Sequence, residues 1–180
     1  LVLVDATDSL GKIPSVEPDE FQIGYDATTR LVKAGCARIA YVGCLEPLIA
    51  QDDRLEGYQA ALRDAGLDYN DARAWYVYEC AARRGLTVGK DISVVGVDNH
   101  RVFAETLEPM LTTVELPHYE MGYWAVGKLV SLIEGEAPDP FPRAGYPVEK
   151  VQPPPLSEQS PQLECQLRIK QSWVRPCSQR

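Results

Sequence analysis

Residues 91–99 read DISVVGVDN, and this stretch decides the fold class. Its branched apolar side chains stand between polar ends, a pattern typical of a strand buried on both faces. The runs Leu1–Val4 (LVLV) and Arg38–Gly43 (RIAYVG) show the same pattern and are predicted to be buried strands as well. The residues Glu164–Lys170 alternate between apolar and polar side chains, which predicts a half-exposed edge strand.

Helical patterns separate these strands. Apolar side chains recur at helical spacing in four segments, and a glycine that can adopt positive φ follows each segment. These predicted helices begin near Ile23, Arg54, Trp75 and Met121 and end before Gly35, Gly66, Gly85 and Gly135. The stretch Lys12–Val16 contains Pro14 and is predicted to be a connection or an edge. Strands that alternate with helices indicate an α/β fold with parallel sheets.

Composition limits the functions open to the chain. It has 180 residues, with 18 Lys and Arg against 26 Asp and Glu, so its formal net charge is −8. This balance argues against a surface that grips nucleic-acid phosphates. Five cysteines at irregular spacing and two histidines argue against a disulfide framework or a zinc site. No apolar run is long enough to span a bilayer, and we expect a cytoplasmic protein with reduced thiols.

Polar residues that follow the predicted strands are the first binding candidates, because open parallel sheets bind ligands at the carboxyl ends of their strands. These candidates are Asp5, the loop Glu46–Arg54, and the pair Asp98-Asn99. A carboxylate, an amide and a guanidinium together suit hydroxyl groups or a planar polar ligand. Each residue also has a simpler interpretation: Arg54 as a surface residue, and Asp98 as the end of a strand through an Asx turn.

Signatures of catalysis are scarce. The sequence contains no GxSxG elbow, no HExxH motif and no cysteine with an evident histidine partner. The carboxylates Glu17, Asp19 and Glu20 suit acid–base chemistry, but in so acidic a chain a solvated turn is the favoured interpretation. We therefore expect no catalytic residues, no cofactor and no metal.

Four segments, in this order and spacing, form a recognisable set: Gly24–Gly43 (GYDATTRLVKAGCARIAYVG), Arg54–Leu62 (RLEGYQAAL), Arg84–Asn99 (RGLTVGKDISVVGVDN) and Leu111–Ile133 (LTTVELPHYEMGYWAVGKLVSLI). Together they resemble the effector-binding region of the LacI/GalR family of bacterial transcription regulators, which is similar to periplasmic sugar-binding proteins. The closing stretch Leu167–Ser172 (LRIKQS) looks like the last strand of that family.

The resemblance implies a two-lobed, periplasmic-binding-protein-like α/β fold with parallel sheets, incomplete in this sequence. It assigns residues 1–35 and 117–136 to the N-terminal lobe, and residues 36–116 and 163–172 to the C-terminal lobe. Residues 137–162 are then a proline-rich connection or insertion, and residues 173–180 a tail. The chain opens inside a strand-like run without an initial Met, so we expect a segment upstream of it.

The resemblance also implies a function without catalysis. A small molecule, a sugar or a nucleoside-like compound, binds in the cleft between the lobes and modulates operator DNA binding by a separate helix-turn-helix domain, absent here. Arg54 aligns with the family arginine that hydrogen-bonds the effector, and Asp98 with a carboxylate that holds a ligand hydroxyl. Phe21 and Gln22 match a cleft-wall aromatic residue and a polar contact. A homodimer is the expected assembly, with helix 121–133 either at its interface or packed on the sheet.

Two departures from the family pattern affect the site. Cys36 stands where the family commonly has histidine. Only eight residues lie between Gly66 and Trp75, where the family inserts a strand, a helix and a strand. The sequence is therefore either part of a longer chain or a truncated protein with an impaired cleft. Two other functions stay open: the sugar-binding component of a transporter, which begins with a secretory leader, and a small α/β enzyme that uses Asp98 or the carboxylates near Glu20.

Overall fold

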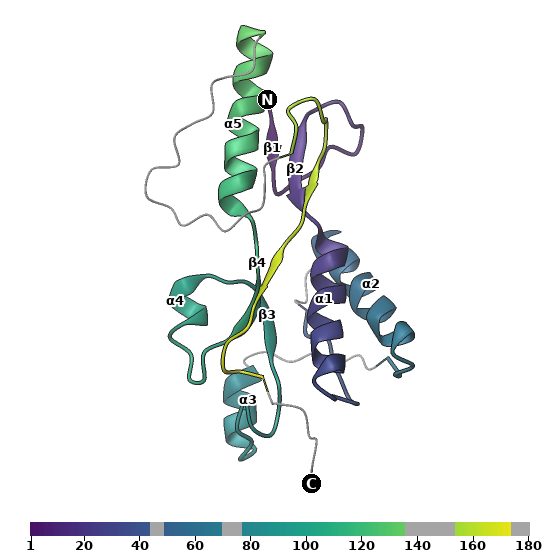
Figure 1. The fold of residues 1–180 in the computed structure, drawn as a ribbon, viewed down its shortest axis with the longest axis vertical. Helices are drawn as coiled ribbons and strands as arrows, with labels where there is room; N and C mark the ends of the chain where they lie inside the picture. The colour runs from purple at the N-terminus through teal and green to yellow at the C-terminus, as the bar shows by residue number, and fades with distance from the viewer. Residues whose placement is uncertain (44–48, 70–76, 136–153, 174–180) are drawn as a thin grey trace. The chain divides into compact units, whose positions relative to one another are not determined.

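A computed structural model describes residues 1–43, 49–69, 77–135 and 154–173. These residues form two compact α/β units (Figure 1). Unit 1 contains Leu1–Asp19 and Pro117–Cys165, and unit 2 contains Glu20–Leu116 and the residues from Gln166 onward. The chain passes from one unit to the other three times. The predicted α/β class is confirmed.

In its described residues, unit 1 is a three-stranded parallel sheet covered by one helix. Its strands are β1 (Leu3–Val4), β2 (Ser15–Pro18) and β5 (Gln162–Leu163), in the order β1-β2-β5. Helix α5 (His118–Glu134) packs against β1 and β2 and ends at Gly135, whose φ of 77° is left-handed. The predicted helix and its glycine stop are therefore confirmed, since only glycine adopts that conformation at no steric cost.

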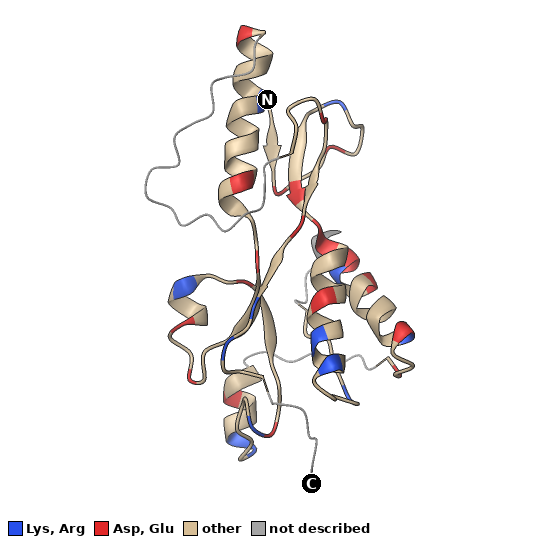
Figure 2. Ribbon diagram, in the orientation of Figure 1, with Lys and Arg blue, Asp and Glu red and all other residues tan. Residues whose placement is uncertain are grey.

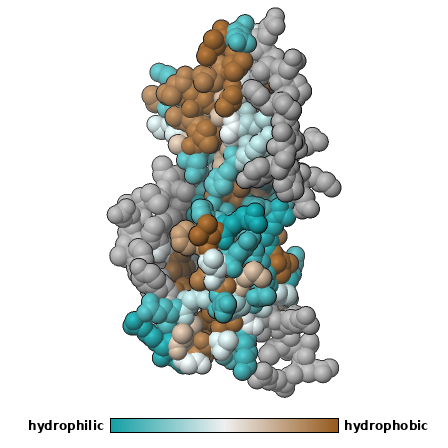
Figure 3. All heavy atoms as spheres, turned by 90° about the vertical axis from the view of Figure 1, so that its left-hand side faces the viewer, coloured by the Kyte–Doolittle hydropathy of each residue, from teal (hydrophilic) through white to brown (hydrophobic). Residues whose placement is uncertain are grey.

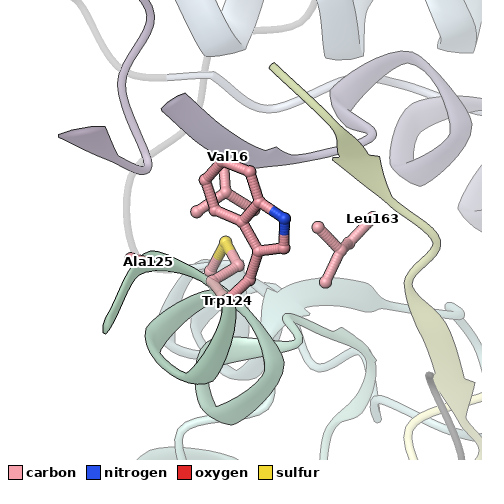
Figure 4. Packing of buried hydrophobic residues seen from close by; sticks show 5 residues of the cluster. Val16, Trp124, Ala125 and Leu163 are labelled. Atoms are coloured by element: carbon pink, nitrogen blue, oxygen red, sulfur yellow. The ribbon is translucent and has the colours of Figure 1, made fainter. Parts of the chain in front are cut away.

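The core of unit 1 is built around Trp124 of α5. Its indole ring is fully buried and points toward Val16 of β2 and Leu163 of β5 (Figure 4). The ring Nε1–H donates to the carbonyl oxygen of Pro155 at 3.3 Å. The ammonium of Lys128, also buried, donates to the carbonyl oxygens of residues 156 and 158 at 2.6 and 2.9 Å. These bonds attach the stretch before β5 to the helix.

The strand β2 corrects the sequence interpretation. We predicted a connection or an edge at Lys12–Val16, but β2 lies in the middle of the sheet, with Ser15 and Val16 buried. Pro14 misled the prediction, because it lies just before the first residue of the strand, where its missing N–H interrupts no ladder. Pairing with β1 and β5 on its two sides makes this polar stretch a strand.

The described residues of unit 2 contain a second three-stranded sheet and four helices. Strand β3 (Val95–Asp98) pairs in parallel with β4 (Thr112–Glu115), which pairs antiparallel with β6 (Gln166–Arg168). The order β3-β4-β6 confirms an edge strand within Glu164–Lys170. The helices of this unit are α1 (Glu20–Lys33), α2 (Ile49–Asp64), α3 (Val77–Arg83) and α4 (Arg101–Ala104).

The predicted strand Arg38–Gly43 is wrong as a ladder strand. Within the described chain, Tyr41 alone takes part in a β-bridge there. Ile39 is nevertheless buried and packs with Tyr58 and Leu62 of α2. The Tyr58 hydroxyl donates to the Ile39 carbonyl oxygen at 2.9 Å. A side chain of α2 therefore satisfies a backbone acceptor that would otherwise pair with a neighbouring strand.

Two glycines let α1 and α2 pack closely. A Cβ atom added at Gly24 of α1 would lie 2.0 Å from the carbonyl oxygen of Arg54, and one added at Gly57 of α2 would lie 2.0 Å from that of Phe21. Both distances are far inside van der Waals contact, so only glycine fits at either position. This crossing fixes the residues on the first turns of α1 relative to α2.

The division into units differs from the lobe boundaries expected from the sequence, residue 35 and residue 163. Helix α1 belongs to unit 2 because it packs along α2, and β5 belongs to unit 1 because it pairs with β2. The predictions for Trp75, for most of the proline-rich stretch 137–162 and for the tail after residue 173 lie outside the described residues. No helix in the described part of the chain is long and apolar enough to cross a membrane.

Candidate functional site

Arg54 of α2 is held by Glu20, the first residue of α1. The guanidinium Nη2 lies 2.6 Å from Glu20 Oε1, and its Nε donates to Oε2 of the same carboxylate. The Arg54 side chain is 24% exposed and that of Glu20 is 9% exposed. The pair is therefore bidentate and largely withdrawn from water, a geometry that fixes the plane of the guanidinium.

This pair corrects the interpretation of Glu20 as part of a solvated turn. Glu20 is buried, and its charge is compensated within the protein by a cation 34 residues away in the sequence. Arg54 and Glu20 meet because α1 and α2 cross closely at Gly24 and Gly57. Charge counts along the chain do not carry that information.

Phe21 and Gln22 lie on the same first turn of α1. The Phe21 ring is 41% exposed and stacks on Tyr25, with ring centroids 6.1 Å apart. The Gln22 amide Nε2 donates to the Asp26 carboxylate at 3.1 Å. An exposed aromatic face beside an amide is suitable for stacking and hydrogen bonding to a ligand.

Asp98 ends strand β3 at a sharp corner. Its φ is 91° and that of Asn99 is 54°, so both residues adopt left-handed conformations that few side chains tolerate. The Asn99 backbone N–H donates to Thr113 Oγ1 of β4 at 3.2 Å, which anchors the corner to the next strand. Strained backbone of this kind is often found at binding sites, where the surrounding structure holds it.

A polar network that the sequence interpretation missed supports this corner. Asn99 Nδ2 donates to Glu115 Oε1 of β4 at 2.9 Å, and the Lys170 ammonium donates to Asn99 Oδ1 at 2.8 Å. Arg168 of β6 forms an ion pair with the other Glu115 oxygen. The position of Glu115 directly after an apolar run was the signal available, since it follows a strand in the same way as Asp98.

The electrostatics of Glu115 follow from this network. Partial burial would by itself raise the pKa of the Glu115 carboxyl. Hydrogen bonds from Asn99 and Arg168, with the positive charges of Arg168 and Lys170, outweigh burial and hold the pKa below its ordinary value. The carboxylate is therefore the stable form in the folded protein.

The structure brings three of the four predicted site residues together. Phe21, Gln22 and Arg54 lie on the crossing of α1 with α2, whereas Asp98 lies at the end of the sheet. Arg54 also lines a cavity of about 830 Å³ with one face of α1, residues 36–43 and the stretch that leads into β3. Phe21, Gln22 and Asp98 do not line that cavity.

The described residues contain no group of three or more His, Cys, Asp and Glu side chains that is arranged to hold a metal ion. What the candidate site offers is hydrogen-bond donors, acceptors and an aromatic face. Groups of this kind are suited to hydrogen bonding and stacking with a polar molecule.

Two α/β units, each built on a short sheet and joined by three chain crossings, define the two-domain fold of periplasmic binding proteins. One family model, for periplasmic binding proteins and the sugar binding domain of the LacI family, matches residues 1–81. A second, for periplasmic-binding-protein-like domains, matches residues 69–152. The two matches together span residues 1–152, so most of the chain is similar to periplasmic-binding-protein-like domains.

Individual relatives agree with this assignment. Catabolite control protein A of Priestia megaterium is 29% identical over 175 residues, which cover 77% of this chain and 52% of the relative. The transcriptional regulator MalR of Streptococcus pneumoniae is 37% identical over 78 residues, which cover 43% of this chain and 24% of the relative. The chain spans about half the length of the curated relatives that it matches most fully.

Solved structures share the fold. The transcription regulator CcpA of Lactococcus lactis matches with a TM-score of 0.70 at 22% identity, over 96% of this chain and 69% of that one. A complex of the transcriptional regulator CelR with cellobiose matches with a TM-score of 0.72 at 24% identity, over 95% of this chain and 58% of that one.

Proposed function

We propose that the chain is the effector-binding region of a bacterial LacI-type transcription regulator, and that it acts in the cytoplasm. A small molecule that binds here modulates operator DNA binding by a separate helix-turn-helix domain. The observation that carries this proposal is the match of residues 1–81 to a family model that includes the LacI sugar binding domain. The regulators among the relatives support it.

We assign the ligand contacts to Arg54, Asp98, Phe21 and Gln22. Arg54 donates hydrogen bonds to ligand hydroxyls, and Asp98 accepts them. Phe21 offers an apolar ring face to a sugar or base ring, and Gln22 adds an amide. Sugars present alternating hydroxyls and C–H faces, so this combination of groups suits a sugar or a nucleoside-like compound. Relatives solved with cellobiose and with ribose support that ligand class.

The proposed mechanism requires no bond to be made or broken in the ligand. The effector binds one conformation of the regulator more tightly than another and shifts the population of the form that binds DNA. A coupling of about 1–3 kcal/mol is typical of such switches and corresponds to a 5- to 150-fold change in DNA affinity. We infer that the protein is not an enzyme.

We also propose a homodimer in which α5 contributes to the interface. The helix is unusual because two of its three charged residues, Glu120 and Lys128, are buried, whereas four apolar side chains are exposed; the third charge, Glu134, is exposed at the end of the helix. These are Val126, Leu129, Leu132 and Ile133, at 38–74% exposure. Figure 3 shows apolar residues gathered over α5, and Figure 2 shows most of the helix free of charge. An uncharged face lets two copies with a net charge of −8 meet with little repulsion.

A sugar-binding component of a transporter is the alternative, because the matched family also includes periplasmic binding proteins. The gene's complete reading frame separates the two functions. A helix-turn-helix upstream of Leu1 supports the regulator, whereas a secretory leader there would establish the transporter component.

A thermal-shift screen of sugars and nucleosides tests the ligand proposal directly. A ligand that binds the native state alone raises the melting temperature by mass action, by an amount that grows with its concentration. We expect at least one sugar or nucleoside to do so and to be recovered unchanged. Turnover of that compound would instead favour an enzyme.

A further inference from the structure

We propose that Glu20 determines the ligand specificity of Arg54: by neutralising the guanidinium, it makes the site select an uncharged, hydrogen-bonding ligand and disfavour an anionic one. This inference rests on the proposed role of Arg54 as a ligand contact. It adds a residue, Glu20, to which the sequence assigned no role in binding.

The first support is the geometry of the pair. Both Glu20 carboxylate oxygens face the Nε and Nη2 edge of Arg54, with Nη2 and Oε1 2.6 Å apart. That edge is one of those on which a guanidinium binds a phosphate or carboxylate through two parallel hydrogen bonds. An anionic ligand that seeks this edge must displace Glu20.

Burial makes displacement of Glu20 costly. The Glu20 side chain is only 9% exposed, so water cannot easily replace the guanidinium as its partner. A buried carboxylate left without its cation is strongly destabilising. An anion that binds beside the pair instead meets the negative charge of Glu20 at short range. A neutral hydroxyl meets neither obstacle.

The backbone also holds the pair in place. Helix α1 contacts the main chain of Arg54 itself, because a Cβ atom added at Gly24 would lie 2.0 Å from the Arg54 carbonyl oxygen. Residues 20 and 54 are therefore fixed by the helix crossing and are not two long side chains that meet by chance. Charge compensation of this kind is built into the site before any ligand binds.

The polar network around Asn99 contains a second pair of a guanidinium with a carboxylate. Arg168 is paired with Glu115, and the Lys170 ammonium lies 2.8 Å from Asn99 Oδ1. The Arg168 guanidinium is therefore also neutralised within the protein.

The experiment uses inorganic phosphate as its probe and the Arg54 Nε–H resonance as its readout. The whole 180-residue chain, labelled with ¹⁵N-arginine, is titrated with phosphate as the wild type and as Glu20→Gln. An Arg54→Lys spectrum assigns the Arg54 signal by its loss. Glu20→Gln keeps the shape of the side chain and removes its charge. We expect phosphate to bind at Arg54 at least about tenfold more tightly in Glu20→Gln than in the wild type.

Two matched variants separate this effect from general changes in charge or stability. Glu79→Gln removes one carboxylate from an exposed ion pair with Arg83 in the same unit, and we expect it to leave the Arg54 signal as in the wild type. Glu20→Asp keeps the negative charge, and we expect it to retain the exclusion of phosphate. Circular dichroism and thermal melts report whether each variant is folded.

Equal phosphate binding by the wild type and Glu20→Gln would overturn the proposal, and so would the absence of binding at Arg54 in both. These outcomes are distinct from those of the sugar screen. If the sugar screen finds no ligand, the proposed function is contradicted even if phosphate binds to Glu20→Gln. A screen with a sugar ligand, together with no effect of Glu20→Gln on phosphate, removes only the role of Glu20.

Discussion

Asp98 has a backbone conformation that suits a precise test of its role. Asparagine adopts positive φ at least as readily as aspartate, so Asp98→Asn keeps the corner at φ 91° and removes only the charge. Arg54→Lys likewise keeps the positive charge and removes the planar fork. We expect each substitution to weaken binding of the effector found in the screen by about tenfold to a hundredfold, the loss of one charge-assisted hydrogen bond of about 1.5–3 kcal/mol.

Isothermal calorimetry with that effector measures both changes. Glu79→Gln, remote from the candidate residues in sequence and on an exposed ion pair, serves as the control and should bind as the wild type does. Wild-type affinity in both Asp98→Asn and Arg54→Lys would remove these residues from the site.

Glu115 predicts a pH dependence of stability. Its pKa is lower in the folded protein than its ordinary value of 4.5, so the folded state binds this proton less readily than the unfolded state does. The carboxylate therefore contributes stability above the ordinary value, and the contribution is lost as the pH falls through the folded pKa. Because Glu115 and Arg168 are each 35% exposed, we expect a contribution of no more than about 1 kcal/mol.

Urea unfolding of the wild type and Glu115→Gln at a series of pH values checks this prediction. The difference in free energy of unfolding should be largest near neutrality and should shrink toward acid pH. A difference that does not change with pH would mean that the network stabilises the protein through packing and not through charge.

At the scale of elements, the close crossing of α1 with α2 depends on glycine. Alanine at Gly24 or Gly57 places a Cβ atom 2.0 Å from a backbone oxygen of the other helix, so the helices must separate. We expect each substitution to lower the free energy of unfolding by about 1–3 kcal/mol, as overpacking does elsewhere. The same separation should weaken effector binding, because it pulls Arg54 away from Glu20.

Gly122 of α5 is the matched control. A Cβ atom there meets nothing within 4 Å, so Gly122→Ala should raise stability by up to about 1 kcal/mol through helix propensity. Chemical denaturation measures all three variants. If Gly24→Ala were as stable as the wild type, the close approach of the two helices would be wrong.

A second prediction at the scale of elements concerns the exposed apolar face of α5. Leu132→Glu and Ile133→Glu add charge to side chains that are 57% and 74% exposed, so neither should disturb the core of unit 1. We expect each to raise the dissociation constant of the homodimer at least about tenfold, because it buries a charge at an apolar interface.

Sedimentation equilibrium measures the association. Val102→Glu, which adds the same charge to an exposed apolar position on α4, is the control and should leave association unchanged. A wild-type chain that stays monomeric, or a dimer unaffected by either α5 substitution, would place the interface elsewhere or remove it.

For the molecule as a whole, net charge makes a simple prediction. A chain with a net charge of −8 repels DNA, so the 180 residues by themselves should not retard a mixed-sequence duplex at physiological salt. An electrophoretic mobility shift assay checks this. Salt-dependent binding by the chain would mean that its own surface contacts DNA. That result would contradict the proposal that a separate domain binds the operator.

Much of the fold could be predicted from the sequence, because the pattern that specifies a helix lies within the helical segment itself. The periodic apolar residues of α1, α2 and α5 and the glycines that end them are signals carried within each segment. The sheet of unit 1 could not be predicted in the same way. Ser15 of β2 lies beside a segment 145 residues away, with its Oγ 3.1 Å from that of Ser160, and no local pattern encodes such a partner.

The same distinction between local signals and long-range contacts applies to the candidate site. Asp98 was found because it follows an apolar run, and Arg54, Phe21 and Gln22 were selected or strengthened by the resemblance. Glu20 was misinterpreted because its burial depends on a crossing of two helices.

One short stretch of chain supplies the third strand of each sheet. Strand β5 ends at Leu163 and β6 begins at Gln166, so a few consecutive residues close unit 1 and then unit 2. During synthesis, neither sheet can gain its third strand until this stretch has left the ribosome, although most of both units is already made. A nascent chain therefore carries two incomplete sheet edges at once. Premature termination before Gln162 should yield an aggregation-prone product, not one folded unit and one unfolded unit.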